Sequence, residues 1–312
     1  MKVAPQPNLL KLPAVERGAG VSILAPASFA RDERIEDGAA RLQALGFTPQ
    51  FMPHALARGP LFFAGTPEER IADLHAAFRD RESQMIMCLR GGYGSNYLLD
   101  RVDLDLIRAH PKPFFAYSDL TGLQLHLLDK LTLPAFHGPM LAADFFREDG
   151  VHRDSFDAAL AGAAYSLDAA QGLRAVKSGS ASGMLYGGCL SILVSLLGTA
   201  WEPQTECKLL FLEDVGAKPY QVDRMLWQFR AAGKLRGVTG IIFGEMLDCA
   251  SPGAEPDLLD KVISNFFADF SGPIAFGLRS GHVSRDNVTL TFGVSAELQV
   301  SDGAQLSIAN RI

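Results

Sequence analysis

The 312-residue sequence lacks several features that would assign it to a common class of protein. It has only four cysteines and no C-x-x-C pair, which argues against a disulfide scaffold or a zinc site. No block of Lys and Arg is present and the formal net charge is −6, so we expect no nucleic-acid partner, because phosphate binding needs concentrated cations. No spacing of His, Asp or Glu fits a metal site, and no P-loop or G-x-G-x-x-G pattern occurs, so we expect neither metal nor cofactor.

Long hydrophobic runs are also missing. The most apolar segment, residues 184–201, is interrupted by Gly187, Gly188 and Gly198, and it predicts a buried helix that is too broken to span a membrane. The amino terminus has no apolar core of the kind found in a signal peptide. We therefore expect a cytoplasmic protein with no membrane partner.

The length and the 48% of hydrophobic residues allow about two domains of about 150 residues each. In the first half, strand-like and helix-like patterns alternate. Buried strands are predicted at 21–25, 85–89 and 113–117, and helices at 31–45, 66–79 and 119–130. Thr66 and Glu69 form a capping-box pattern at the start of the second helix. Such alternation predicts a parallel sheet, with ligands at the carboxyl ends of its strands.

The second half is richer in strand patterns. Strands are predicted at 209–213, 241–243, 274–276 and 288–292, helices at 190–197 and 220–232, and a hairpin over 296–308 around Asp302-Gly303. We predict an α/β protein with an amino-terminal, parallel, flavodoxin-like domain over 1–150. A linker region over 151–178 would follow, and then a smaller, β-rich, carboxyl-terminal α/β domain over 179–312.

Two segments of the first half could carry chemistry. Ser118 lies where a strand becomes a helix, so it is either a nucleophile exposed above the sheet or simply the helix cap. Its neighbours do not complete a G-x-S-x-G pattern. The glycine-rich loop over 90–95 follows a buried strand, and it serves either a tight turn or the binding of an oxyanion by backbone N–H groups.

Candidates for a general base and its partner come from both halves. Glu213 ends an apolar strand, where a carboxylate can orient a histidine. His282, in a loop between small and apolar residues, and His137, beside Gly138, are equal candidates for the base on local grounds. The local patterns leave this choice open.

Several motifs in one order carry a family resemblance. They are Ile23-Leu24-Ala25-Pro26-Ala27-Ser28, Arg90-Gly91-Gly92-Tyr93-Gly94-Ser95, Tyr117-Ser118-Asp119-Leu120-Thr121, Phe136-His137-Gly138-Pro139-Met140, Phe211-Leu212-Glu213-Asp214-Val215 and Gly281-His282. Over nearly its whole length the chain resembles the LD-carboxypeptidases, a family of serine peptidases. The resemblance implies a catalytic triad of Ser118, His282 and Glu213. It also implies an oxyanion hole of backbone N–H groups from Gly92 (or Gly91) and Asp119, a two-domain fold with the site between the domains, and a homodimer.

The resemblance further implies a substrate, a small peptide. The reaction would remove the terminal D-alanine from murein tetrapeptides during cell-wall recycling. Arg90, Gly91 and Tyr93 are the candidate substrate-binding residues. The terminal carboxylate of such a peptide needs a cation or N–H donors, for which Arg90, Arg224 and Arg279 are candidates.

Two other functions remain open. The microcin-immunity branch of the family cleaves aminoacyl-nucleotide amides, for which Trp201 or Trp227 could stack on the base, although core positions are expected for both. A non-catalytic protein that binds murein peptides is the other alternative. The chain also departs from the family pattern at Cys189, where Asn is common, and at Arg279-Ser280, where Pro-Phe is frequent.

Overall fold

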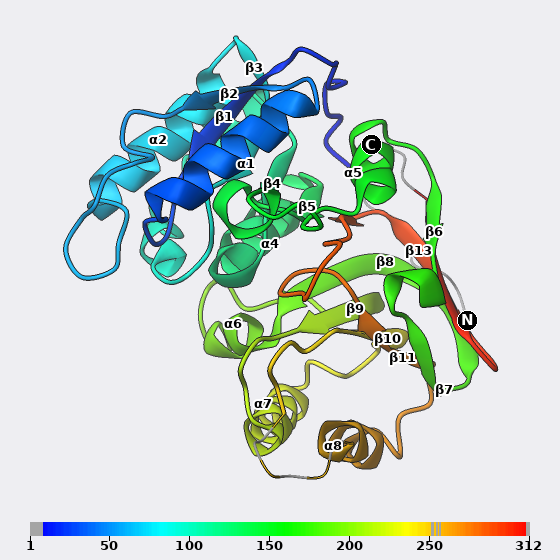
Figure 1. Ribbon diagram of the computed structural model, residues 1–312. Coiled ribbons are helices and arrows are strands. Elements are labelled where there is room, and N and C mark those ends of the chain that lie inside the picture. The colour runs from blue at the N-terminus through cyan, green and yellow to red at the C-terminus, as the bar shows by residue number, and fades with distance from the viewer. Residues whose placement is uncertain (1–8, 251–252, 254, 256, 310–312) are drawn as a thin grey trace.

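The computed structural model describes residues 9–250, 253, 255 and 257–309. Residues 1–8 of the amino terminus discussed above lie outside that part. The chain forms two sheets, one in each half, with the amino-terminal half above and the carboxyl-terminal half below in Figure 1. None of the described helices combines the length and the apolarity needed to cross a membrane.

The first sheet has six strands in the order β12-β5-β4-β3-β1-β2. They are β1 (Gly20–Leu24), β2 (Thr48–Phe51), β3 (Ser83–Cys88), β4 (Phe114–Ala116), β5 (Ala135–His137) and β12 (Leu290–Phe292). β1 to β5 pair in parallel, and their order is that of flavodoxin, which confirms the predicted fold class. The order reverses between β1 and β3, so the loops after these two strands diverge and leave room for a ligand.

Helices of the first half follow the strands as the alternating pattern predicts. They are α1 (Asp32–Ala44), α2 (Pro67–Arg79), α3 (Leu104–Ala109) and α4 (Thr121–Leu131), with the short turns η1 (Ser95–Leu98), η2 (Ser118–Leu120) and η3 (Leu141–Phe145). The capping box of α2 is present: Thr66 N–H donates to Glu69 Oε2 (2.8 Å), and Glu69 N–H donates to Thr66 Oγ1 (3.2 Å). These two bonds satisfy N–H groups that the first turn leaves free, so the helix begins where the sequence predicts.

The second sheet has eight strands in the order β6-β14-β13-β8-β9-β10-β11-β7. They are β6 (Tyr165–Leu167), β7 (Arg174–Lys177), β8 (Gly179–Cys189), β9 (Lys208–Glu213), β10 (Gly240–Gly244), β11 (Ile274–Leu278), β13 (Ser295–Val300) and β14 (Ala304–Ala309). The four strands β8 to β11 are parallel, and the predicted hairpin is β13 and β14. The helices of this half are α6 (Leu190–Ser195), α7 (Pro219–Ala231) and α8 (Leu258–Phe266).

Three local expectations need correction. The predicted linker region over 151–178 holds α5 (Arg153–Leu160), β6, η4 (Ala169–Gln171) and β7, because two-turn helices and short edge strands give little periodicity in a sequence. The apolar segment 184–201 is the end of β8 followed by the short α6, since strand β8 continues to Cys189. Of the two tryptophans expected in the core, Trp227 is 64% exposed on α7.

The two halves share elements at their boundary. α4 places Leu123 and Leu127 in the core of the first half, and Leu125 and Leu128 in the core of the second. β12 comes from the second half of the sequence but pairs antiparallel with β5 of the first sheet. The two domains therefore meet along a packed interface, and the loop that precedes β12 carries His282 to the carboxyl ends of the first sheet.

Candidate functional site

Ser118 begins the turn between β4 and α4 in a left-handed conformation. Its φ is +66°, which costs a non-glycine residue on the order of 1–2 kcal/mol. β4 before it and α4 after it are both buried, so the chain must turn sharply at this position. The Ser118 side chain projects into a cavity, and backbone strain of this kind is concentrated at functional sites.

The glycine-rich loop after β3 packs directly against this turn. A Cβ on Gly91 would lie 2.7 Å from Ser118 Cβ, 2.8 Å from Ser118 Oγ and 3.3 Å from the Asp119 backbone N. Ser95 fastens the two segments together, because its N–H donates to Asp119 Oδ2 (2.8 Å) and its Oγ donates to Asp119 O (2.6 Å). The Asp119 carboxylate therefore holds the loop in place, and only the absence of a side chain at Gly91 allows so close an approach.

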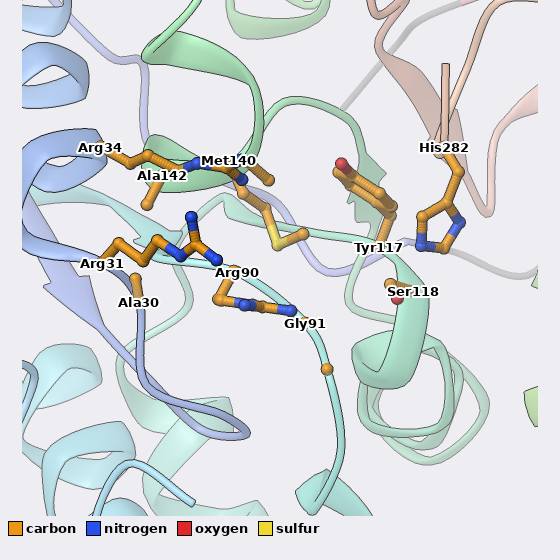
Figure 2. A pocket seen from close by; sticks show the side chains of 12 residues that line it. Ala30, Arg31, Arg34, Arg90, Gly91, Tyr117, Ser118, Met140, Ala142 and His282 are labelled. Atoms are coloured by element: carbon orange, nitrogen blue, oxygen red, sulfur yellow. The ribbon is translucent and has the colours of Figure 1, made fainter. Parts of the chain in front are cut away.

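His282 and Glu213 form the hydrogen-bonded pair of the site. His282 Nδ1 lies 2.8 Å from Glu213 Oε2, and the His282 backbone N–H donates to the same oxygen (3.0 Å). Glu213 is fully buried at the end of β9. Figure 2 shows the His282 ring above Ser118 and beside Tyr117, whose ring it meets edge to face at 5.2 Å. Ser118 and His282 form no hydrogen bond with each other in this arrangement, and such bonds often tighten only when substrate is bound.

Burial and charge act in opposite directions on this pair. Burial disfavours the charged imidazolium, but the charge of Glu213 and its hydrogen bond outweigh burial and raise the pKa of His282 above its ordinary value. Burial likewise disfavours the carboxylate, yet the attraction and the hydrogen bond of His282 keep the pKa of Glu213 below its usual range. The pair is therefore a carboxylate that stabilises a protonated histidine, which a general base requires during catalysis.

A buried amide fastens the His282 loop to the first half of the chain. Asn287 Oδ1 accepts from Gly281 N–H (3.0 Å), and its Nδ2 donates to Gly281 O (3.1 Å) and to Asp144 Oδ1 (3.1 Å). Burial raises the pKa of Asp144 to about 6. These residues were absent from the sequence-based prediction, because Asn and Asp more than a hundred positions apart carry no local pattern that would link them.

His137, the other candidate base, lies outside the cavity. It is fully buried and packs against Tyr117, Phe211 and Phe292, with ring centroids 5.2–5.8 Å away. Burial lowers the pKa of His137 to about 4, so the ring stays neutral. The structure therefore places His282 beside Ser118 and uses His137 as a packing residue behind it.

The cavity beside Ser118 has a volume of about 240 Å³. It brings together Ser118, His282, Arg90, Gly91 and Gly92. Gly92 and Gly91 are thus both beside Ser118.

Three other predicted residues lie elsewhere. Tyr93 faces a second cavity that also contains Trp201. Arg224 stacks on Tyr220 of α7, 5.5 Å from the ring centroid. Arg279 donates to Ala170 O (2.6 Å) and lines a separate hollow, so neither arginine reaches the cavity of Ser118.

Cys189 stands next to the pair of His282 and Glu213. One ligand atom of each of the three lies within 4.8 Å of the others, the one group of at least three such side chains in the described residues that could hold a metal ion. The Glu213 and His282 atoms already bond to each other, and burial, with the nearby carboxylates, raises the pKa of the Cys189 thiol well above its usual value. The thiol is therefore protonated, and a metal would have to displace its proton.

Comparison with known proteins gives the family. The family description "LD-carboxypeptidase N-terminal domain" matches residues 21–138, and "LD-carboxypeptidase C-terminal domain" matches 182–298. The chain belongs to the LD-carboxypeptidase family. It is 34% identical over 294 residues to the "Probable murein peptide carboxypeptidase" of Bacillus subtilis (strain 168), and the aligned region covers 93% of this chain and 91% of that protein.

Two solved structures have the same fold as this member of the LD-carboxypeptidase family. Muramoyltetrapeptide carboxypeptidase from Oxalobacter formigenes superposes with a TM-score of 0.81 at 28% identity, over 93% of this chain and 98% of that one. An MccF-like protein from Bacillus anthracis str. Ames has a TM-score of 0.85 at 25% identity, over 96% and 99%. The predicted two-domain α/β architecture is confirmed.

Gly91→Ala tests the close contact with Ser118. The added Cβ would collide with Ser118, so we expect the hydroxyl to shift and the catalytic rate to fall about 100-fold or more. Gly303→Ala is the matched control, because its Cβ would meet nothing within 4 Å. Steady-state rates and thermal unfolding of both variants check the prediction, and an active Gly91→Ala enzyme would contradict it.

Proposed function

We propose that this protein is a serine carboxypeptidase that releases the terminal D-alanine from murein tetrapeptides. The main observation behind the proposal is that Ser118 of the first domain and His282 of the second line one cavity, and that His282 is hydrogen-bonded to the buried Glu213. Family membership supports the peptidase chemistry, and the names of the Bacillus subtilis and Oxalobacter formigenes proteins support the substrate.

Ser118 would attack the carbonyl carbon of the L-configured residue. A serine hydroxyl is a weak nucleophile, so a base must take its proton, and His282 Nε2 is the free ring nitrogen once Nδ1 bonds to Glu213. The developing oxyanion would be held by backbone N–H groups of Gly92, or Gly91, and Asp119, whose loop and turn are packed together beside Ser118.

His282 would then return the proton to the leaving amine of D-alanine. An acyl ester remains on Ser118 Oγ. A water molecule that gives a proton to His282 then attacks the ester carbonyl carbon, and the bond to Ser118 Oγ breaks as His282 returns the proton to that oxygen. Glu213 would stabilise the imidazolium in both halves of the reaction. No metal or cofactor enters this scheme.

An alternative is the activity of the family's microcin-immunity branch, an amidase for aminoacyl-nucleotide amides, and the likeness to the MccF-like protein of Bacillus anthracis keeps this alternative open. A nucleotide base would need an aromatic partner. Trp227 is exposed on α7 and Trp201 faces the other cavity. Tyr117 lines the Ser118 cavity, but its side chain is only 5% exposed and packs edge to face against His282, so it leaves little ring surface for a base to stack on. The peptide substrate is therefore the better proposal, and tight binding of an aminoacyl-sulfamoyl adenylate would favour the alternative.

The stereochemistry of the last residue tests the proposed function. We expect mass spectrometry to show loss of one residue from a tetrapeptide that ends in D-alanine, and little loss from the same peptide ending in L-alanine. Equal rates on the two peptides would refute LD specificity. No loss from either would refute the murein substrate and direct the search to acyl-nucleotide amides.

The rate should depend on pH through His282. The base must be neutral, so kcat/KM falls as pH drops through the pKa of His282, which Glu213 raises above 6.5. We therefore expect an acid limb whose midpoint lies above 6.5 in the free enzyme. A pH profile of kcat/KM checks this, and a rate that stays flat down to about pH 4 would exclude histidine as the base.

A further inference from the structure

A buried thiol lies beside the pair of His282 and Glu213. Strands β8 and β9 run parallel and side by side (Figure 1), and their register sets Cys189, the last residue of β8, opposite Glu213, the last residue of β9. Partners in such a register direct their side chains to the same face of the sheet. The sulfur of Cys189, a carboxylate oxygen of Glu213 and a ring nitrogen of His282 therefore lie within 4.8 Å of one another.

These three side chains offer the ligand atoms that a zinc ion prefers. Zinc binds Cys sulfur, His nitrogen and carboxylate oxygen, and bonds of about 2.0–2.3 Å place tetrahedral ligand atoms about 3.3–3.8 Å apart. The present separations of at most 4.8 Å reach that spacing by side-chain shifts of about 1 Å. His282 lines the cavity of Ser118, so a metal can enter from the cavity and take water as its fourth ligand.

One acceptor of this cluster has no partner among the described residues. Glu213 Oε2 accepts twice from His282, but no hydrogen bond reaches the buried Oε1. A buried carboxylate oxygen without a donor costs free energy that a cation would recover. Burial raises the pKa of the Cys189 thiol, and the charges of Glu213 and Asp214 raise it further. The same charges attract a divalent cation, which replaces the thiol proton when it binds.

We propose that Cys189, Glu213 and His282 bind Zn²⁺ or a similar thiophilic cation, and that the bound metal reversibly inhibits the enzyme. The inhibition rests on the proposed peptidase function, whereas the binding rests on the side-chain cluster alone. The thiol proton passes to solvent as the bond between zinc and sulfur forms. A metal on His282 Nε2 occupies the lone pair that takes the proton of Ser118, and a metal on Nδ1 leaves the ring proton on Nε2. In both cases His282 no longer acts as a base.

Matched cysteine variants test the site. We measure zinc binding by equilibrium dialysis, and the rate on a tetrapeptide ending in D-alanine with Zn²⁺ or with EDTA, for the wild type, Cys189→Ser and Cys207→Ser. The wild type should bind one Zn²⁺ and lose most of its rate, and EDTA should restore it. Cys189→Ser should need about tenfold or more zinc for the same fractional inhibition, because a hydroxyl is a poor zinc ligand. Cys207 is exposed and outside the cluster, so its variant should respond to zinc as the wild type does.

Cadmium gives a readout that does not depend on activity. A bond between cadmium and a thiolate absorbs in the ultraviolet, so this band should appear in the wild type and in Cys207→Ser and be absent from Cys189→Ser. Mg²⁺ prefers six oxygen ligands and should not inhibit. Thermal unfolding checks that each variant folds, and Cys189→Ala takes the place of Cys189→Ser if the buried hydroxyl prevents folding.

The outcomes separate the metal site from the catalytic proposal. Absence of zinc binding by the wild type, or equal binding by the wild type and Cys189→Ser, would overturn the site. Zinc that binds through Cys189 without slowing the peptidase would overturn the inhibition. If the wild type does not cleave the peptide even with EDTA, the proposed function fails, while dialysis and the cadmium band still decide whether the site exists.

Discussion

Ser118→Ala should reduce release of D-alanine by about 10⁴-fold or more, to a level that mass spectrometry barely detects. The substitution removes the hydroxyl oxygen that we propose as the nucleophile, while His282 and Glu213 remain paired at 2.8 Å. Because the Ser118 hydroxyl takes part in no buried hydrogen-bond network of the described residues, the variant should fold and bind the tetrapeptide. Turnover and calorimetric binding are measured on the same preparation.

Two further variants show whether the loss of activity is specific to the Ser118 hydroxyl. Ser180→Ala, an exposed serine of β8, should keep full activity. Ser118→Gly should be as inactive as Ser118→Ala but more stable by about 1 kcal/mol, because glycine adopts a φ of +66° without strain. Full activity of Ser118→Ala would mean that another serine is the nucleophile, and tight binding without turnover by the wild type would favour a non-catalytic binding protein.

Glu213→Gln should lower kcat by about 10³ to 10⁴-fold with little change in fold. Glu213 Oε2 accepts from both the ring and the backbone of His282, and glutamine keeps the shape but loses the charge that stabilises the imidazolium. The same change removes the attraction that raises the pKa of His282, so the acid limb of any residual activity should move to lower pH. Steady-state rates across pH measure both effects.

Asp214→Asn is the matched control for this prediction. Asp214 is also buried and is next in sequence, but it accepts from the backbone N–H groups of Ser191 and Val215 instead of from His282. Its loss of rate should be far smaller than that of Glu213→Gln. Similar losses in the two variants would mean that general electrostatics of the β9 end, and not the contact with His282, supports the rate.

Much of the fold could be predicted because its signals are local. Thr66 and Glu69 mark the start of α2, and Asp302-Gly303 marks the β13–β14 turn, each through a backbone requirement confined to a few residues. The edge strands β6 and β7 escaped prediction, since short strands at a sheet edge have weak patterns and owe their conformation to their neighbours. The antiparallel pairing of β12 with β5 likewise depends on a contact between distant segments.

The alternating α/β architecture, the ordered motifs of the family, and Ser118, Glu213 and His282 as candidates can all be predicted from the amino-acid sequence, because each depends on a short stretch of residues. Local sequence patterns left His282 and His137 as equal candidates, and the packing separates them: His137 is buried among aromatic rings, whereas His282 lines the cavity. Only the tertiary structure brings Asn287 to Asp144, and Cys189 to His282, across segments that carry no shared pattern. Residues far apart in the chain can form one site only where strands and loops meet in space, and that meeting follows from the burial of two cores along one interface.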